Sequence, residues 1–394
     1  MTRRPESKPA KRGSQRAPSA LVAALAQVGS LDVAAQFEAH PEWPRLPLRS
    51  YPWVDHPPEH VVAAAAAAAR APESVPTLGF QALRVSLAHE LGTAVGARVD
   101  VDEIAVTNGA MGALSVLWSA LLEPGDQVLV PAPNYYVEGS IILAGGRFRP
   151  VQAVESDRTD WERIERSITT ATKVLFLTNP NNPVGKVLTR QDLSVLATLV
   201  DAHPSLWIVV DESYEAVQHE GRQHLAAWLD PALRDRSIIV RSFSKSFAVT
   251  WLRLGWLAGP TAVVQSVAKV IQWQQLYGSF LNQRVALAVL EGDRSWLSPA
   301  MEGFSHGRNL LYEQIAAIPG CRVHLPEAGP FLFPDISRAR KKSSAIISDL
   351  HRHGISAIPG SYFAGSETCF RFPVGGDQET QLKAAEILAQ VLSD

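Results

Sequence analysis

The stretch LWIVVDESY, residues 206–214, is an apolar run that suits a buried β-strand and that ends in acidic and polar residues. Longer amphipathic segments separate it from similar runs between residues 100 and 260. This alternation predicts an α/β fold with a mostly parallel sheet covered by helices. The other runs of this form are EIAVTNG (103–109), QVLVPAP (127–133), KVLFLTNP (173–180) and SIIVRSFS (237–244).

Polar and small residues follow the predicted strands where each one ends. Ligands in open parallel sheets bind beyond the carboxyl ends of the strands, so we expect these side chains to meet in one crevice. Serine, arginine and free amides at a helix start suit a phosphate, and a tyrosine face suits a planar ring. A carboxylate favours a protonated ring nitrogen, and a lysine amine can capture an aldehyde. The residues are Gly109, Ala110, Tyr135, Asn182, Asp211, Tyr214, Ser242, Ser244, Lys245 and, shortly beyond, Arg253.

The length and composition indicate a globular protein with more than one domain. The chain has 394 residues, of which 46% are hydrophobic and 19% charged. It exceeds the usual size of a single domain, and its last eighty residues form a second α/β pattern. We predict a disordered arm over 1–29, a segment over 30–60 that packs with the small domain, a large domain over 61–292 and a small C-terminal domain over 293–394.

Charge and cysteine content exclude several classes of function. The formal net charge of −2 argues against a nucleic-acid or membrane-surface role, because such proteins carry a basic face. No apolar span is long enough for a membrane helix or a secretory signal. The two cysteines, Cys321 and Cys369, give neither a disulfide framework nor zinc spacing. We therefore expect no metal and a cytoplasmic location.

Common catalytic and nucleotide motifs are missing. VGKV at 184–187 ends like a phosphate-binding P-loop, but Pro180 stands where that loop needs a glycine. HELGT at 89–93 lacks the second histidine of a zinc helix. The chain has neither the glycine fingerprint of dinucleotide-binding folds nor the serine elbow of α/β hydrolases.

Five ordered motifs resemble those of the aminotransferase class I/II family, the fold-type-I enzymes that depend on pyridoxal 5′-phosphate (PLP). The resemblance covers roughly residues 55 to 390. It implies a large PLP-binding domain with a mostly parallel sheet and a smaller C-terminal α/β domain. The motifs are NPNNPVG (179–185), DESY (211–214), SFSK (242–245), LRLGW (252–256) and FRF (370–372).

The resemblance implies a role for each matching residue. Lys245 corresponds to the Schiff-base lysine and Asp211 to the partner of the pyridine nitrogen, and both are expected to be catalytic together with Tyr214. Arg371 corresponds to the arginine that grips the substrate α-carboxylate through a bidentate pair. The expected cofactor ligands are Gly109, Ala110 and Met111 at the phosphate turn, Tyr135 stacked on the ring, Asn182 and Tyr214 at the ring oxygen, and Ser242, Ser244 and Arg253 at the phosphate.

The chain departs from the family pattern on the substrate side. Tyr51 falls near a position that is usually glycine, so a bulky ring would stand where substrates approach. No tyrosine precedes Gly79 in ESVPTLG (73–79), and Met111 replaces a frequent threonine or serine. We expect Tyr51, Phe331, Asn182 and Arg371 to contact the substrate. QLYGSFLNQ (275–283) resembles the family's interface loop, which implies a homodimer with shared active sites.

The resemblance predicts an aminotransferase that acts on an L-α-amino acid and a 2-oxo acid through Lys245 and abstraction of the Cα proton. The altered substrate side leaves an alternative open: elimination, replacement or ring closure on the same fold. A regulatory protein that reuses the domain is a third hypothesis. It is disfavoured because the first thirty residues are too short for a DNA-binding domain and the lysine is intact.

Overall fold

The computed structural model describes residues 20–25, 28, 32–52, 54, 56–156, 158–339 and 341–393. Most of the predicted N-terminal arm, 1–29, lies outside the described residues. Its described part forms the short helix α1 (Ala20–Leu25). No described helix is both long enough and apolar enough to cross a membrane.

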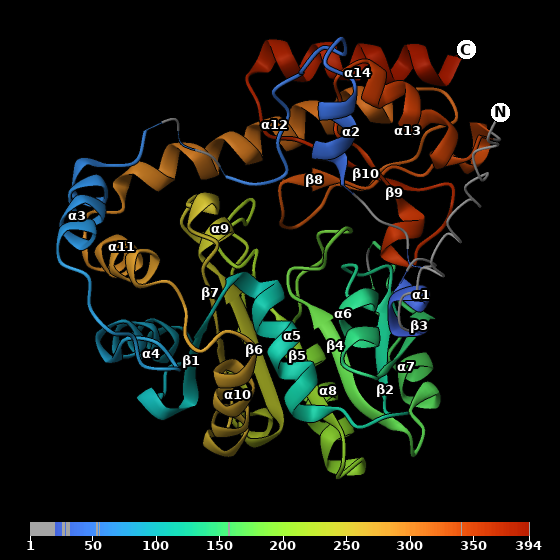
Figure 1. The fold of residues 1–394 in the computed structure, drawn as a ribbon. Helices are drawn as coiled ribbons and strands as arrows, with labels where there is room; N and C mark the ends of the chain where they lie inside the picture. The colour runs from blue at the N-terminus through green and yellow to red at the C-terminus, as the bar shows by residue number, and fades with distance from the viewer. Residues whose placement is uncertain are drawn as a thin grey trace, which may run out of the picture.

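A seven-stranded sheet forms the centre of the molecule (Figure 1), and its strand order is β1-β7-β6-β5-β4-β2-β3. Neighbouring strands from β6 to β3 are parallel, whereas β7 runs antiparallel to both β1 and β6. The predicted fold class, a mostly parallel sheet covered by helices, is confirmed. The strands are β1 (Ile104–Thr107), β2 (Gln127–Ala132), β3 (Arg147–Gln152), β4 (Thr172–Thr178), β5 (Trp207–Asp211), β6 (Ser237–Ser242) and β7 (Gly255–Ala258).

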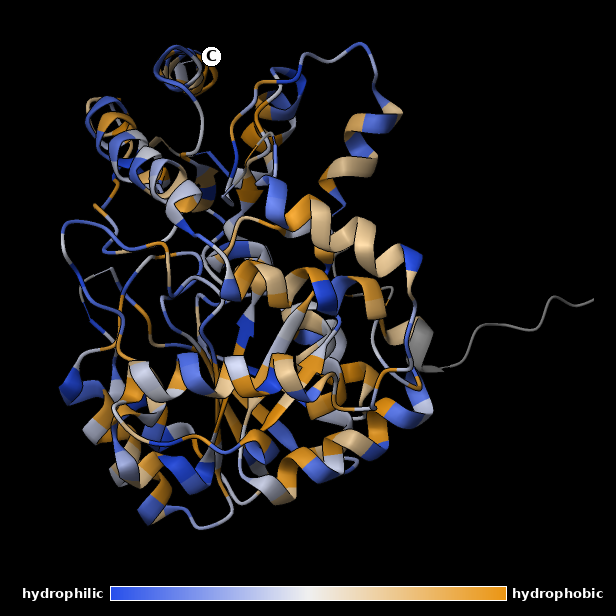
Figure 2. Ribbon diagram, turned by 90° about the vertical axis from the view of Figure 1, so that its left-hand side faces the viewer, coloured by the Kyte–Doolittle hydropathy of each residue, from blue (hydrophilic) through white to orange (hydrophobic). Residues whose placement is uncertain are grey.

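Helices cover both faces of this sheet, so its strands are apolar throughout. In β5, Ile208 and Val210 pack into one hydrophobic cluster and Val209 into the other. The strands at the centre are correspondingly hydrophobic in Figure 2. The helices on the first face are α3 (Glu59–Arg70), α4 (Gln81–Val95), α7 (Trp161–Ser167), α8 (Arg190–Ala202) and α11 (Phe280–Glu291), and those on the second are α5 (Gly109–Leu121), α6 (Glu138–Leu143) and α10 (Thr261–Gln274).

A smaller sheet and three helices form a second hydrophobic core near the C-terminus. The sheet is antiparallel with the order β8-β10-β9. Its middle strand, β10, carries Arg371. The small sheet lies on the side of these helices that faces the large sheet (Figure 1). The elements are β8 (Phe331–Leu332), β9 (Ile358–Pro359), β10 (Phe370–Pro373), α12 (Ser298–Ala316), α13 (Ser343–Arg352) and α14 (Gln378–Ser393).

The segment before α3 lies against this second core. Helix α2 (Val33–Ala39) leads into an extended stretch in which Arg49 and Gly375 exchange backbone hydrogen bonds of 2.8 and 2.9 Å. Leu48 is buried in the second cluster. The stretch ends at Ser50 and Tyr51, which therefore stand beside the carboxyl edge of the large sheet. The domain boundaries at 60/61 and 292/293 remain predictions.

Three features of the sheet region differ from the sequence-based expectation. Strand β3 was not predicted because it is a half-exposed edge strand without an apolar run. Strand β7 has four residues and begins within the LRLGW motif. The sequence of residues 261–292 predicts a single helix, but the structure divides it into α10 and α11, because Leu276 in the connection adopts a left-handed backbone with φ of 67°.

Candidate active site

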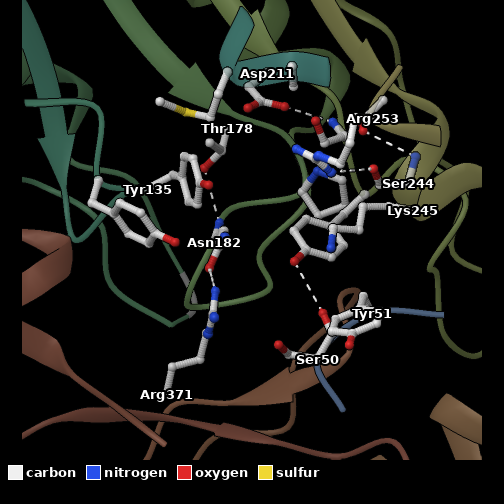
Figure 3. Close-up of a pocket in the computed structure, with 17 residues that line it drawn as sticks. Ser50, Tyr51, Tyr135, Thr178, Asn182, Asp211, Ser244, Lys245, Arg253 and Arg371 are labelled. Carbon is white, nitrogen blue, oxygen red and sulfur yellow. Dashed lines mark hydrogen bonds between the residues drawn. The ribbon is translucent and has the colours of Figure 1, made fainter. Parts of the chain in front are cut away.

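The carboxyl ends of β4, β5 and β6 surround a cavity of about 260 Å³ (Figure 3). Segments from both cores contribute to it, so it lies where the two cores meet. Its lining consists of Ser50, Tyr51, Ala110, Met111, Tyr135, Tyr136, Thr178, Pro180, Asn182, Asp211, Ser213, Tyr214, Ser242, Ser244, Lys245, Arg253 and Arg371.

Lys245 stands in the single turn of helix α9 (Phe243–Ser246), directly after β6. Ser242 caps this turn by accepting a hydrogen bond of 3.2 Å from the Ser244 amide. Burial, followed by the positive charges of Arg371 and Arg253, lowers the pKa of the Lys245 amine to about 7. The neutral amine, which is the nucleophilic form, is thus accessible near neutral pH. The Lys245 Nζ lies 4.6 Å from the centroid of the Tyr51 ring.

One end of the cavity combines a helix start with an arginine. Helix α5 begins at Gly109, whose φ is 73°, and a Cβ there would stand 3.2 Å from Arg253 Nη2. A Cβ at Gly255 of β7 would stand 2.5 Å from the Gly109 carbonyl carbon. Arg253 Nη1 donates to Ser244 Oγ at 3.3 Å. Free amides, a guanidinium and a hydroxyl therefore converge, and this combination is typical of a site for a phosphate group.

Asp211 ends β5 at the middle of the cavity. Its Oδ1 accepts a hydrogen bond of 2.9 Å from the Ser213 amide. Burial nevertheless raises the pKa of this carboxyl to about 6. A cationic partner beside it would favour the ionised form. The carboxylate is therefore suited to a protonated nitrogen on a ligand.

Tyrosines cover two sides of the cavity. Burial raises the pKa of Tyr135 well above its ordinary value and that of Tyr214 to about 12, so both phenols stay neutral. The Tyr214 hydroxyl donates to the Ser50 carbonyl at 3.2 Å (Figure 3). This bond ties the segment before α3 to the strand ends.

Arg371 enters the cavity from the second core. It is 8% exposed, and its Nη1 donates to Asn182 Oδ1 at 3.0 Å (Figure 3). Its guanidinium carbon lies 5.4 Å from the Phe331 ring centroid and 5.2 Å from that of Phe363. Within the described ranges no carboxylate pairs with Arg371, so this buried cation is available to a ligand carboxylate.

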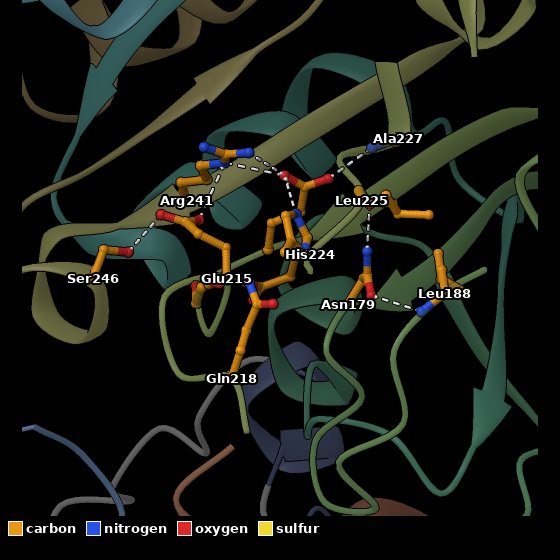
Figure 4. Close-up of polar contacts among 12 residues, drawn as sticks. Asn179, Leu188, Glu215, Gln218, His224, Leu225, Ala227, Arg241 and Ser246 are labelled. Carbon is orange, nitrogen blue, oxygen red and sulfur yellow. Dashed lines mark hydrogen bonds and ion pairs between the residues drawn. The ribbon is translucent and has the colours of Figure 1, made fainter. Parts of the chain in front are cut away.

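A buried polar network supports the turn that carries Lys245 (Figure 4). Arg241 pairs with Glu212 at 2.8 Å and with Glu215 at 3.1 Å, and Ser246 Oγ donates to Glu215 at 2.7 Å. Burial disfavours an ionised Glu212, but the charges of His224 and Arg241 outweigh it and lower the pKa to about 2. Ser246 directly follows the lysine, so the network fixes α9 against the ends of β5 and β6.

Most of the residues predicted from the sequence come together here. The exceptions are Gly109, which lies behind the lining at the start of α5, and Phe331. The structure places Phe331 in the second core beneath Arg371 and Tyr214, whose ring centroid is 5.3 Å away. Phe331 therefore supports these two side chains, and its predicted contact with substrate remains untested.

Five lining residues were not predicted from the sequence. Thr178, the last residue of β4, carried the same strand-end signal as Asp211 and was overlooked; its hydroxyl accepts from the Asn182 amide at 3.0 Å. Pro180 lay within a quoted motif without a role. Ser213 likewise lay within the quoted DESY motif, and Tyr136 was the alternative to its neighbour Tyr135 for the stacking role. Nothing in the sequence indicates Ser50. Among the residues that the structure describes, no group of three His, Cys, Asp or Glu side chains is placed to hold a metal ion.

Comparisons with known proteins agree with this architecture. The profile of the family "Aminotransferase class I and II" matches residues 50–388. An arginine–pyruvate transaminase of Pseudomonas aeruginosa is 34% identical over 295 residues, which is 73% of this chain and 74% of the relative. An aspartate aminotransferase of Streptomyces avermitilis is 31% identical over 359 residues, 86% of each chain.

The solved structure of Thermus thermophilus aspartate aminotransferase with maleate matches at a TM-score of 0.83 and 30% identity. The match covers 95% of this chain and 97% of that chain. The five motifs, the fold and these relatives agree along nearly the whole length of the protein. The chain therefore belongs to the aminotransferase class I and II family.

Proposed function

We propose that this protein is a PLP-dependent aminotransferase that moves the amino group of an L-α-amino acid to a 2-oxo acid. The observation that carries the proposal is the Lys245 amine, whose pKa is lowered to about 7, in one cavity with the Asp211 carboxylate and the Arg253 guanidinium. The named relatives act on different amino donors, aspartate and arginine, so they leave the substrate of this chain open.

The residues of the cavity fit PLP. The start of α5 with Ser242, Ser244 and Arg253 suits its phosphate, and Ala110 and Met111 contribute backbone amides there. Asp211 suits the pyridine nitrogen, because a protonated nitrogen supplies the cation that this buried carboxylate lacks. Tyr135 is placed to stack on the ring, and Asn182 and Tyr214 are placed to hydrogen-bond its oxygen.

When bound, PLP supplies an aldehyde that an amine can capture and a protonated ring that accepts the electron pair released at Cα. Lys245 is the amine positioned to hold the aldehyde. Once a substrate amine takes that place, the freed Lys245 amine is the general base that accepts the Cα proton. A pKa near 7 suits this task, since a base works best when its pKa lies close to the operating pH.

Arg371 and Asn182 orient the substrate. A bidentate pair between the guanidinium and the α-carboxylate fixes the rotation about the Cα bonds. This orientation would turn the Cα–H bond toward Lys245, the base that accepts its proton. Tyr51, whose ring lies beside the Lys245 amine, narrows the space on the same side. Elimination, replacement and ring closure are not favoured, because the relatives that match this chain are named as aminotransferases.

We also propose a homodimer. Large apolar side chains are exposed on and beside the predicted interface loop, 275–283, and Trp273 is 88% exposed. Asn282 bonds the Leu252 carbonyl at 2.7 Å, which places this surface next to Arg253. A second copy covering it would enclose the phosphate end of the cavity. Sedimentation equilibrium of the holoenzyme is expected to give a dimer mass, and a monomer would contradict this proposal. We also expect the protein to be located in the cytoplasm.

The activity is tested with PLP-loaded protein, a panel of L-amino acids and 2-oxo acid acceptors, by chromatographic detection of the new amino acid. The wild type is expected to convert at least one pair. Lys245→Ala is expected to lose at least about 10³-fold in rate, because it removes both the holding amine and the base. Lys383→Ala, on the exposed face of α14, is the matched control and should keep full activity. A Lys245→Ala variant that retained the activity would refute the mechanism.

A further inference from the structure

A second cavity of about 510 Å³ adjoins the first and shares three of its lining residues, Met111, Tyr135 and Tyr136. Its other walls come from α6, from β3 and from the loop that precedes β10. The two cavities therefore have a common wall. The remaining lining residues are Val28, Asn134, Glu138, Gly139, Ser140, Phe148, Ser361, Tyr362, Phe363 and Ala364.

The second cavity lies close to the expected position of the substrate carboxylate. Phe363, one of its walls, packs against the Arg371 guanidinium at 5.2 Å. The same ring meets Tyr136 edge to face, with 6.0 Å between centroids. An amino acid whose carboxylate is bound to Arg371 would therefore lie next to the Phe363 ring, which is also a wall of the second cavity. A side chain that runs past Tyr136 would enter this cavity.

Among the residues that the structure describes, Glu138 is the only charged side chain that lines the second cavity. Within the described ranges its carboxylate has neither a hydrogen bond nor an ion pair. A glutamate at a helix start usually serves the free backbone amides, and such bonds lower its pKa. Here burial raises the pKa of Glu138 instead. The carboxylate thus has no structural partner and faces a largely aromatic space.

The positive charges of the two cavities are few, and each has an assigned role. The cations of the first cavity are Lys245, Arg253 and Arg371, which match the amine, the phosphate and the α-carboxylate. None of the described residues that line the second cavity is a cation. A donor with an acidic side chain would place a second carboxylate near Glu138 without a compensating charge, which is unfavourable.

We propose that the second cavity receives the side chain of the amino donor and that Glu138 selects long side chains with a cationic end, a guanidinium or an ammonium group. This inference rests on the proposed aminotransferase activity. Aromatic walls bind the apolar stem of such a side chain, and the carboxylate pairs with its charged end. The donor class is therefore basic amino acids with stems of three or four methylene groups.

Binding to the holoenzyme tests the selection without any turnover. The probes are 5-guanidinopentanoate, which is arginine without its α-amine, and hexanoate, which lacks the charge; isothermal titration calorimetry measures both dissociation constants. We expect the guanidinium compound to bind at least about 10-fold more tightly, as a charge-assisted hydrogen bond provides. Glu138→Gln should reduce this preference to about 2-fold or less.

Two further variants make the result specific. Glu138→Asp keeps the charge on a shorter stem and should retain part of the preference. Glu162→Gln removes an exposed carboxylate of α7 that is paired with Arg166, and it should preserve the full preference. Equal binding of the two probes by the wild type, or a preference that survives Glu138→Gln, would overturn the proposal.

Turnover separates this inference from the function on which it rests. We expect L-arginine or L-lysine to exceed L-norleucine and L-aspartate in kcat/KM, and Glu138→Gln to lower the ratio of arginine to norleucine about 10- to 100-fold. Preferential use of norleucine or aspartate would contradict the role of Glu138 while supporting transamination. The predicted binding preference without turnover of any donor would support Glu138 and refute the proposed activity.

Discussion

Two walls of the active cavity are built in different ways. The strand-end wall, which consists of Asp211, Ser242, Ser244 and Lys245, follows directly from β5 and β6 and is fixed by the buried network behind it. The outer wall consists of Tyr51 and Tyr136, and it continues into Glu138 and Tyr362 of the second cavity. It is assembled from segments far apart in the sequence. We propose that the first wall carries the chemistry of the reaction and that the second wall selects the substrate.

Asp211→Asn should produce the largest effect on the strand-end wall. The amide keeps the size of the side chain but cannot stabilise a protonated ring nitrogen, so we expect kcat to fall about 10³-fold. Rapid-mixing measurement of the cofactor spectrum during the half-reaction checks this. The exposed Asp201→Asn on α8 is the control and should match the wild type. A loss smaller than 10-fold would show that this wall does not control the chemistry.

Arg371→Lys should have the next largest effect and should act on binding. Lysine keeps the charge but loses the bidentate geometry, so we expect kcat/KM to fall about 100-fold, mainly through KM. The affinity for PLP, measured by absorbance titration, should stay within about 2-fold, because Arg371 belongs to the second core. A lower affinity for PLP with an unchanged KM would contradict the assignment of cofactor binding and substrate binding to different walls.

Ser246→Ala should have the smallest effect and tests the network behind Lys245. Glu215 would lose its 2.7 Å donor while remaining buried, so the free energy of unfolding in urea should fall by about 1–3 kcal/mol. The matched control is Ser266→Ala, because the Ser266 hydroxyl donates only to the exposed Ala262 carbonyl in α10. Equal stability of the two variants would show that the network does not fix the turn.

The same contrast decides what the sequence alone could reveal. The strand-end wall was predictable because a strand and its final side chain are local in sequence, as in LWIVVD before Asp211. Strand β7 was not predicted because a run of four residues shows too little of a strand pattern. The break between α10 and α11 at Leu276 was not predicted because the apolar periodicity continues across it. The proposed role of Glu138 could not be predicted from the sequence. It depends on a cavity that α6 forms with the residues around 362, and these segments are far apart in the chain.

The central claim is that the strand-end wall holds PLP through Lys245. Reduction of the PLP-loaded protein with borohydride, followed by proteolysis and mass spectrometry, tests it most directly, because reduction makes the link to the lysine permanent. The account predicts the phosphopyridoxyl group on the peptide that contains Lys245 as the principal modified site. The group on another lysine, or an unmodified Lys245 in protein that has bound PLP, would contradict it.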